Sequence, residues 1–210
     1  FILFLVFIAC FNNQNNQIVE ETVIPVSEEN KDISTFLESE VNKDNNETES
    51  VMYYVRAHNY LEQKNFLNAE KFFDTVIKLE PEFSRAWLGR ATSKFYQDKY
   101  ESSLSDLNKS IELKNDLGEA YLLKSIILLE LKDLENSEKE IINFETLVPP
   151  EWPILIRARI YGERGEFNKS EDLFAKSISI SSDPTLSYWW RAKIRANFNK
   201  LEDSIDDFKE

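Results

Sequence analysis

The sequence repeats itself from Ser50 onward, and this period constrains the fold more than any other feature. Copies of one unit begin at Ser50, Ser84, Gly118, Glu151 and Thr185, so successive starts lie 34, 34, 33 and 34 residues apart. Within each copy, two stretches with apolar residues at helical spacing flank a short polar break. One helical hairpin cannot bury both of its faces, so such a chain is predicted to stack hairpins around a shared core.

Equivalent positions of the copies carry the same kinds of residue. A large residue stands at the fourth position: Tyr53, Trp87, Tyr121, Ile154 and Tyr188. A small residue stands at the eighth position: Ala57, Ala91, Ser125, Ala158 and Ala192. The second stretch opens on Phe66, Tyr100, Leu134, Phe167 and Leu201. Small residues follow at Ala69, Ser103, Ser137, Ser170 and Ser204, and large apolar residues at Phe73, Leu107, Ile141, Phe174 and Phe208. Residues of these types predict a packed core and not a cofactor site.

This joint recurrence resembles the tetratricopeptide repeat (TPR). The resemblance implies an all-α, right-handed superhelical solenoid of about five repeats behind a disordered N-terminal tether. The repeats would cover 50–83, 84–117, 118–150, 151–184 and 185–210, the last one incomplete. It also implies a scaffold for protein–protein interaction, with a peptide or helix held in a concave groove that the first helices line. The groove positions of the family hold Tyr54, His58, Arg85, Thr92, Trp152, Arg159, Trp189 and Lys193.

The resemblance does not extend to the carboxylate clamp of heat-shock chaperone cofactors. Those members hold a terminal carboxylate with Lys, Asn and Arg side chains. The matching positions here hold Tyr54, His58, Gly89, Glu119 and Leu123, so no chaperone clamp is expected. At the C-terminal end of the groove, Arg159 and Lys193 beside Trp152 and Trp189 suggest a site for an acidic or aromatic segment. Alternatively, the two cations are solvated and the tryptophans cover the end of the stack.

The seventh position is cationic in every copy: Arg56, Arg90, Lys124, Arg157 and Arg191. Five cations in register could form a ladder for phosphate or an acidic peptide. However, Asp106, Glu140 and Asp207 lie sixteen residues after three of them, on the second stretch of the same copy. Partly buried cations are usually paired. We therefore expect ion pairs inside the hairpins in preference to a ligand site.

The N-terminus contains a wholly apolar run at 1–9, too short to span a bilayer as a helix of roughly 20 residues. Such a run fits the apolar core of a secretory signal. Ala9-Cys10 after it resembles the lipobox of bacterial lipoproteins, with Phe7 in place of the usual Leu, a departure that spirochaetal lipoproteins tolerate. The resemblance implies that Cys10 becomes an acylated (palmitate-bearing) N-terminus, and that the protein is lipid-anchored in the cell envelope, at the outer membrane or periplasmic face. The alternative is a core cysteine in a buried helix.

Negative charge is concentrated in the segment that follows Cys10. Ten acidic residues and two lysines between 11 and 49 give this segment a net charge of −8, out of −13 for the chain. Together with its Asn- and Gln-rich tracts, this predicts that 10–49 forms an extended tether. The chain has no basic surplus, so it is not expected to bind nucleic acid.

No catalytic constellation is visible in the sequence. The chain has one histidine and one cysteine, too few for a usual zinc site, and it lacks the phosphate-binding and nucleophile motifs. We therefore expect no cofactor, no metal and no enzymatic activity. An alternative function is an accessory repeat region of a longer envelope-assembly protein or enzyme.

Overall fold

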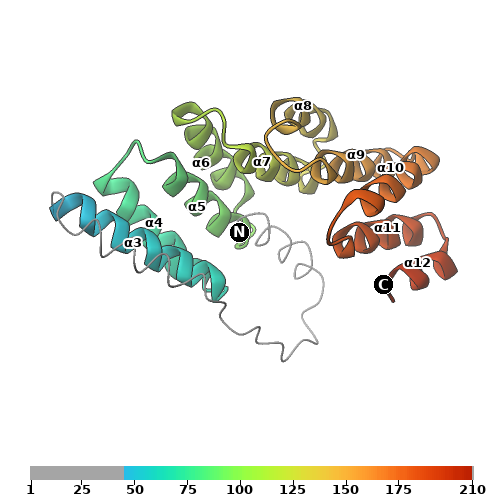
Figure 1. Cartoon of the computed structure of the whole chain (residues 1–210), viewed down its shortest axis with the longest axis horizontal. Coiled ribbons are helices and arrows are strands. Elements are labelled where there is room, and N and C mark those ends of the chain that lie inside the picture. The colour runs from blue at the N-terminus through green and yellow to red at the C-terminus, as the bar shows by residue number, and fades with distance from the viewer. Residues whose placement is uncertain (1–44, 210) are drawn as a thin grey trace. The chain divides into compact units, whose positions relative to one another are not determined.

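The computed structural model describes residues 45–209, and every regular element in that range is an α-helix (Figure 1). The chain divides into two compact units, of which the first ends at Leu113 and the second begins at Lys114. Their described residues form two helical hairpins in the first unit and three in the second. The predicted all-α class is confirmed for the described range, whereas the handedness of a superhelix stays a prediction.

The helices follow the two stretches of each sequence copy. The first unit contains α3 (Asn45–Glu62), α4 (Phe66–Leu79), α5 (Ser84–Phe95) and α6 (Tyr100–Leu113). The second contains α7 (Gly118–Glu130), α8 (Leu134–Phe144), α9 (Glu151–Glu163), α10 (Phe167–Ile180), α11 (Thr185–Asn197) and α12 (Leu201–Asp207). The helices of each hairpin pack together, and in the second unit α9 also contacts α7 and α11. The first helices α7, α9 and α11 thus form one continuous surface of this unit.

Each hairpin turns at a residue in the left-handed backbone region. Lys64, Asp98, Lys132 and Asn199 have φ between 57° and 62°, and Gly165 has φ of 84°. The backbone hydrogen bonds around these residues close each first helix in the same way. At the third turn, Lys132 N–H donates to Leu129 O at 3.0 Å and Asp133 N–H to Leu128 O at 2.8 Å. This is the hydrogen-bond pattern of a Schellman motif, which satisfies the last carbonyls of a helix.

The small residues hold the two helices of a hairpin close together. All five eighth-position residues are fully buried. In four hairpins a serine of the second helix donates its hydroxyl to the carbonyl of that residue: Ser103 to Ala91 at 2.7 Å, Ser137 to Ser125 at 2.9 Å, Ser170 to Ala158 at 2.8 Å and Ser204 to Ala192 at 2.8 Å. The first hairpin has Ala69 at the serine position. The recurring serine therefore supplies a hydrogen bond as well as a short side chain.

The core sits where the second helix of one hairpin meets the first helix of the next. Phe73 on α4 is fully buried and belongs to a cluster with Ala57, Leu61 and Ala86. Its ring lies directly against Gly89 of α5, where an added Cβ would stand 2.3 Å from Phe73 Cζ. Only a residue without a side chain fits beside this ring, which explains a glycine within α5.

Two core predictions are corrected by the structure. The fourth-position side chains are half-buried and not central: Trp87 donates its indole N–H to Pro81 O at 2.8 Å and lies 4.7 Å from the guanidinium carbon of Arg90. Phe208 is 57% exposed, because α12 ends at Asp207 and the residue only caps that helix. The other four large apolar residues of its set are fully buried.

The boundary of the tether also differs from the prediction. Helix α3 begins at Asn45, so the last five residues of the predicted 10–49 tether are helical. The remainder of that segment lies outside the described residues, as do the apolar run at 1–9 and Cys10.

Candidate functional site

The seventh-position cations form the predicted ion pairs within three hairpins. Arg90 binds both carboxylate oxygens of Asp106 at 2.8 Å, Lys124 contacts Glu140 at 2.8 Å, and Arg191 binds the two oxygens of Asp207 at 2.6 and 3.0 Å. Asp106 and Asp207 are almost fully buried. These three cations therefore do not form a row of ligand-binding sites, because carboxylates of the same hairpin already pair with them.

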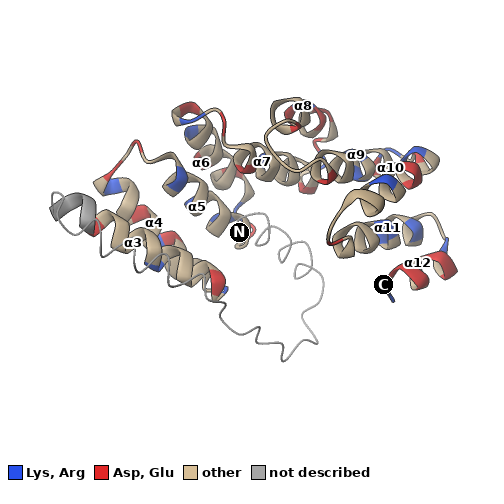
Figure 2. Cartoon of the chain, viewed as in Figure 1, with Lys and Arg blue, Asp and Glu red and all other residues tan. Residues whose placement is uncertain are grey.

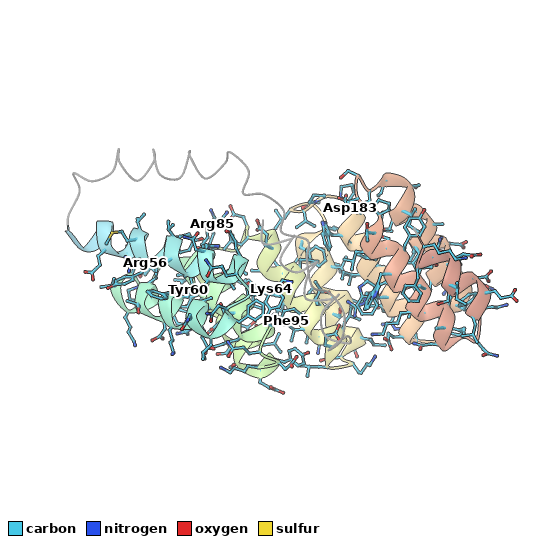
Figure 3. The ribbon with its side chains drawn as sticks, turned by 90° about the horizontal axis from the view of Figure 1, so that it is seen from below. Arg56, Tyr60, Lys64, Arg85, Phe95 and Asp183 are labelled. Carbon is cyan, nitrogen blue, oxygen red and sulfur yellow. The ribbon has the colours of Figure 1, made fainter. Side chains whose placement is uncertain are left out.

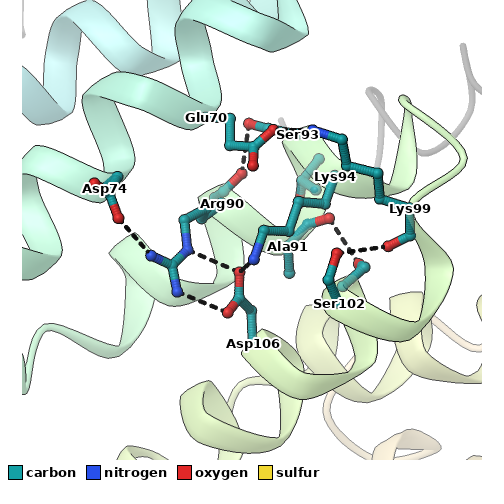
Figure 4. A network of polar contacts seen from close by, with 12 residues as sticks. Glu70, Asp74, Arg90, Ala91, Ser93, Lys94, Lys99, Ser102 and Asp106 are labelled. Atoms are coloured by element: carbon teal, nitrogen blue, oxygen red, sulfur yellow. Dashed lines mark hydrogen bonds and ion pairs between the residues drawn. The ribbon is translucent and has the colours of Figure 1, made fainter.

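Arg90 extends this pairing across two hairpins of the first unit (Figure 4). It reaches back to Asp74 of α4 at 2.8 Å while Lys94 contacts Asp106 at 2.7 Å. Burial alone would lower the pKa of Arg90, but the hydrogen bonds and charge of Asp106 raise it instead. Asp74 accepts a hydrogen bond from Lys78, which together with Arg90 lowers the pKa of the Asp74 carboxyl. The network holds α4, α5 and α6 in one arrangement.

The other two cations of this set have no acid sixteen residues later. Arg157 contacts Glu145 of the preceding hairpin at 2.7 Å. Arg56 is exposed and lies, like Arg85, at the surface of the first unit (Figure 3).

In the first unit, two of the predicted groove residues form an aromatic cluster. The Tyr54 ring lies 4.5 Å from His58 and 4.9 Å from Phe83, and His58 lies edge-on to Phe73 at 5.2 Å. Burial, assisted by the positive charge of Arg85, lowers the pKa of His58 to about 4. The imidazole is therefore neutral near pH 7 and acts here as a packing group.

The remaining groove residues of the first unit differ in exposure. Arg85 on α5 is exposed, as a ligand-contacting cation requires. Thr92 is fully buried, and its hydroxyl donates to Leu88 O of the same helix at 2.8 Å. The placement of Thr92 on a ligand-facing surface is therefore wrong in the described structure.

In the second unit, the predicted groove residues lie on α9 and α11. Arg159 is 3% exposed: it contacts Glu130 of α7 at 2.8 Å, and its guanidinium carbon lies 3.3 Å above the Trp190 ring. Arg159 is thus a buried structural cation, contrary to the interpretation of it as a groove contact or a solvated residue. Lys193, Trp152 and Trp189 are half-buried.

Lys193 lies over the same Trp190 ring as Arg159. Its Nζ lies 4.7 Å from the Trp190 ring centroid and 5.3 Å from that of Trp189. Burial lowers the pKa of Lys193, although Glu130 and Glu163 partly oppose the shift. We call Glu130, Arg159, Trp189, Trp190 and Lys193 the α7–α9–α11 cluster. Sequence reasoning missed Glu130 and Trp190, because Glu130 belongs to the preceding hairpin and Trp190 was not assigned to the groove.

Charge on the last hairpin is segregated between its helices, with basic residues on α11 and acidic residues on α12 (Figure 2).

Within residues 49–209, no group of three or more His, Cys, Asp or Glu side chains could hold a metal ion. None of the helices described in 45–209 combines the length and the apolar character that crossing a bilayer demands.

Comparison with known proteins matches one segment of the chain to a repeat family. Residues 51–83 match the family model for the tetratricopeptide repeat. The Protein STIP1 homolog of Dictyostelium discoideum is 37% identical over 76 residues, which are 36% of this chain and 14% of that protein. The chain therefore spans only a small part of this relative.

Two solved structures share the fold at low identity. PilW, a type IV pilus biogenesis factor, aligns with a TM-score of 0.66 and 18% identity over 76% of this chain and 74% of that chain. YrrB, a TPR protein with an unusual peptide-binding site, aligns with a TM-score of 0.56 and 11% identity over 83% of this chain and 88% of that chain. Residues 51–83 therefore match the tetratricopeptide repeat, and the described helices have the fold of proteins built from this repeat.

Proposed function

We propose that this protein is a membrane-anchored interaction scaffold of the bacterial cell envelope, which binds a peptide or a helix of a partner protein along its first helices. The observation that carries the proposal is the composition of the predicted groove positions. After the core and the ion pairs are assembled, Arg85 stays exposed, while Trp152, Trp189 and Lys193 stay half-buried. Tryptophan and cationic side chains at a surface are frequent anchors of protein interfaces.

The rigidity of the hairpins supports this role. In the four hairpins from α5 onward, a serine-to-carbonyl hydrogen bond fixes the first helix to the second, and in three of them an ion pair adds to it. Side chains on such helices are held in place before a partner arrives, which lowers the entropic cost of binding. YrrB shares this fold and has a peptide-binding site, which makes a peptide a reasonable class of ligand here. No enzymatic activity is proposed.

The anchoring part of the proposal depends on the sequence around Cys10. Several acyl chains would hold a protein on a membrane where one would not. In the full-length gene, Cys10→Ser should shift the protein from the detergent phase to the aqueous phase in a detergent partition experiment. Unchanged partition of this variant would contradict acylation at Cys10.

The binding part can be tested by crosslinking pull-down from the native membrane fraction. Arg85→Glu/Lys193→Glu reverses two cations of the first helices that have no ion pair in the described structure. The matched control is Lys176→Glu/Lys200→Glu, which reverses two exposed lysines away from the first helices. The proposal predicts that the first variant loses partners that the control retains. Equal recovery of the same partners by both folded variants would refute it.

A further inference from the structure

Lys193 differs from the other cations that lack a carboxylate partner. Within residues 49–209, the remaining cations without an ion pair are all exposed: Arg56, Lys64, Lys71, Arg85, Lys176 and Lys200. Lys193 is half-buried, and its ammonium lies over the indoles of Trp189 and Trp190. A partly desolvated ammonium without an anion is unfavourable unless an anion joins it.

The carboxylates near Lys193 are already bound to other cations. Glu130 contacts Arg159 at 2.8 Å, and Glu163 contacts Lys132 at 2.7 Å. Glu130 and Glu163 occupy the same position of successive repeats, and so do Arg159 and Lys193. By analogy with the Glu130–Arg159 pair, Glu163 would pair with Lys193, but it contacts Lys132 instead. Three cations share two carboxylates at this surface, which leaves a local charge of +1.

Two buried donors in the same group also lack an acceptor. Arg159 Nε and Trp190 Nε1 have no hydrogen-bond partner among the described residues, and each residue is only 3% exposed. A buried N–H without an acceptor costs free energy. The α7–α9–α11 cluster is therefore short of negative charge and of hydrogen-bond acceptors at one place.

We infer that the α7–α9–α11 cluster receives a carboxylate side chain of an acidic segment of a partner protein. Lys193 pairs with the carboxylate, and the half-buried Trp189 indole packs against the methylene groups that carry it. A Glu or Asp side chain supplies the negative charge that Lys193 lacks, and this charge complementarity selects the occupant. The inference rests on the proposed function and names the chemistry of the partner.

The test begins by selecting binders to the whole chain from a random twelve-residue peptide display library. The most enriched peptide is then synthesised in two forms, one with its acidic residues and one with Gln or Asn in their place. Calorimetric titration gives the Kd of each peptide for wild type, Lys193→Met and Lys176→Met. Methionine keeps the stacking methylenes and removes the charge, and Lys176 is an exposed control on α10.

The inference predicts a selection rich in Asp and Glu. It also predicts that Lys193→Met and the neutral peptide each weaken binding about tenfold or more, and that the neutral peptide does not distinguish Lys193→Met from wild type. Lys176→Met should bind both peptides as wild type does. If Lys193→Met fails to fold, the comparison of the two peptides on wild type still tests whether binding requires the carboxylates.

Two other outcomes have separate meanings. Peptides that bind tightly, but equally in their acidic and neutral forms, would overturn the carboxylate site and leave the scaffold function standing. A library that yields no binder would count against both the scaffold function and this inference.

Discussion

Replacing Gly89 by Ala tests the packing between successive hairpins in the first unit. The new Cβ would stand 2.3, 2.4 and 2.7 Å from three ring atoms of Phe73. Carbon atoms in normal contact are about 3.5–4.0 Å apart, so the ring or the helix must move by roughly 1 Å. Such overpacking costs about 1–3 kcal/mol, and the better helix propensity of Ala offsets about 1 kcal/mol. Because Phe73 is fully buried and the 2.3 Å overlap is severe, we expect the upper end of this balance, a net loss of about 2 kcal/mol.

Urea unfolding followed by circular dichroism measures this loss. In a Phe73→Leu background the ring is gone, so Gly89→Ala should be neutral or stabilise by up to about 1 kcal/mol, and the double-mutant cycle should show strong coupling. Gly162→Ala is the matched control, because its Cβ would stand 2.7, 2.9 and 3.0 Å from three atoms of Ile194, a milder overlap than the one with Phe73. Its loss should be smaller. A neutral or stabilising Gly89→Ala, or additive effects in the cycle, would refute the packing account.

Three further predictions concern single features of the chain. The pKa of His58 is about 4 in the folded state, against about 6.5 in the unfolded state, so the unfolded state takes up its proton first as pH falls. The free energy of unfolding should therefore drop between pH 6.5 and 4 by up to about 3 kcal/mol, and by less in His58→Leu. Urea unfolding at pH 7 and pH 4 measures both drops. An equal drop in both proteins would exclude His58 as the cause. Trp87→Ala should lower the free energy of unfolding by about 2 kcal/mol, less than the loss of a fully buried tryptophan. In a chain that keeps Trp87 and lacks the other tryptophans, acrylamide should quench its fluorescence only partially. Free quenching would contradict the half-buried position. A chain that begins at Asn45 should keep its thermal midpoint within about 2 °C of a chain that begins at Phe11, since the segment at 11–44 is polar and acidic. A large drop would give that segment a structural role.

Features that recur within one hairpin could be predicted from the sequence. The start of each second helix, the buried small residues and the pairs of Arg90, Lys124 and Arg191 follow from spacing alone. In each case both partners belong to the same sequence copy, so the period fixes their relation. Repetition over five copies then separates the pattern from chance.

Features that depend on a neighbouring hairpin could not be predicted in this way. Arg159 was assigned to the groove by its repeat position, but Glu130 and Trp190 from adjacent hairpins bury it. Thr92 shares a groove position with Arg159, yet its hydroxyl binds its own helix and is not presented to a ligand. Which side chain fills a contact between hairpins depends on residue size and local rotation, and the period specifies neither. Sequence position alone therefore overestimated the ligand-facing surface.

The central claim is that partners bind along the first helices of the hairpins. Photocrosslinking with a benzoyl-phenylalanine residue tests it most directly. The probe would replace Arg85 on α5 or Trp189 on α11, and, as matched controls, the exposed Ser105 on α6 or Asp172 on α10. Irradiation in the native membrane fraction should give partner adducts from positions 85 and 189 and none from 105 and 172. Adducts from the second-helix positions alone would contradict the account.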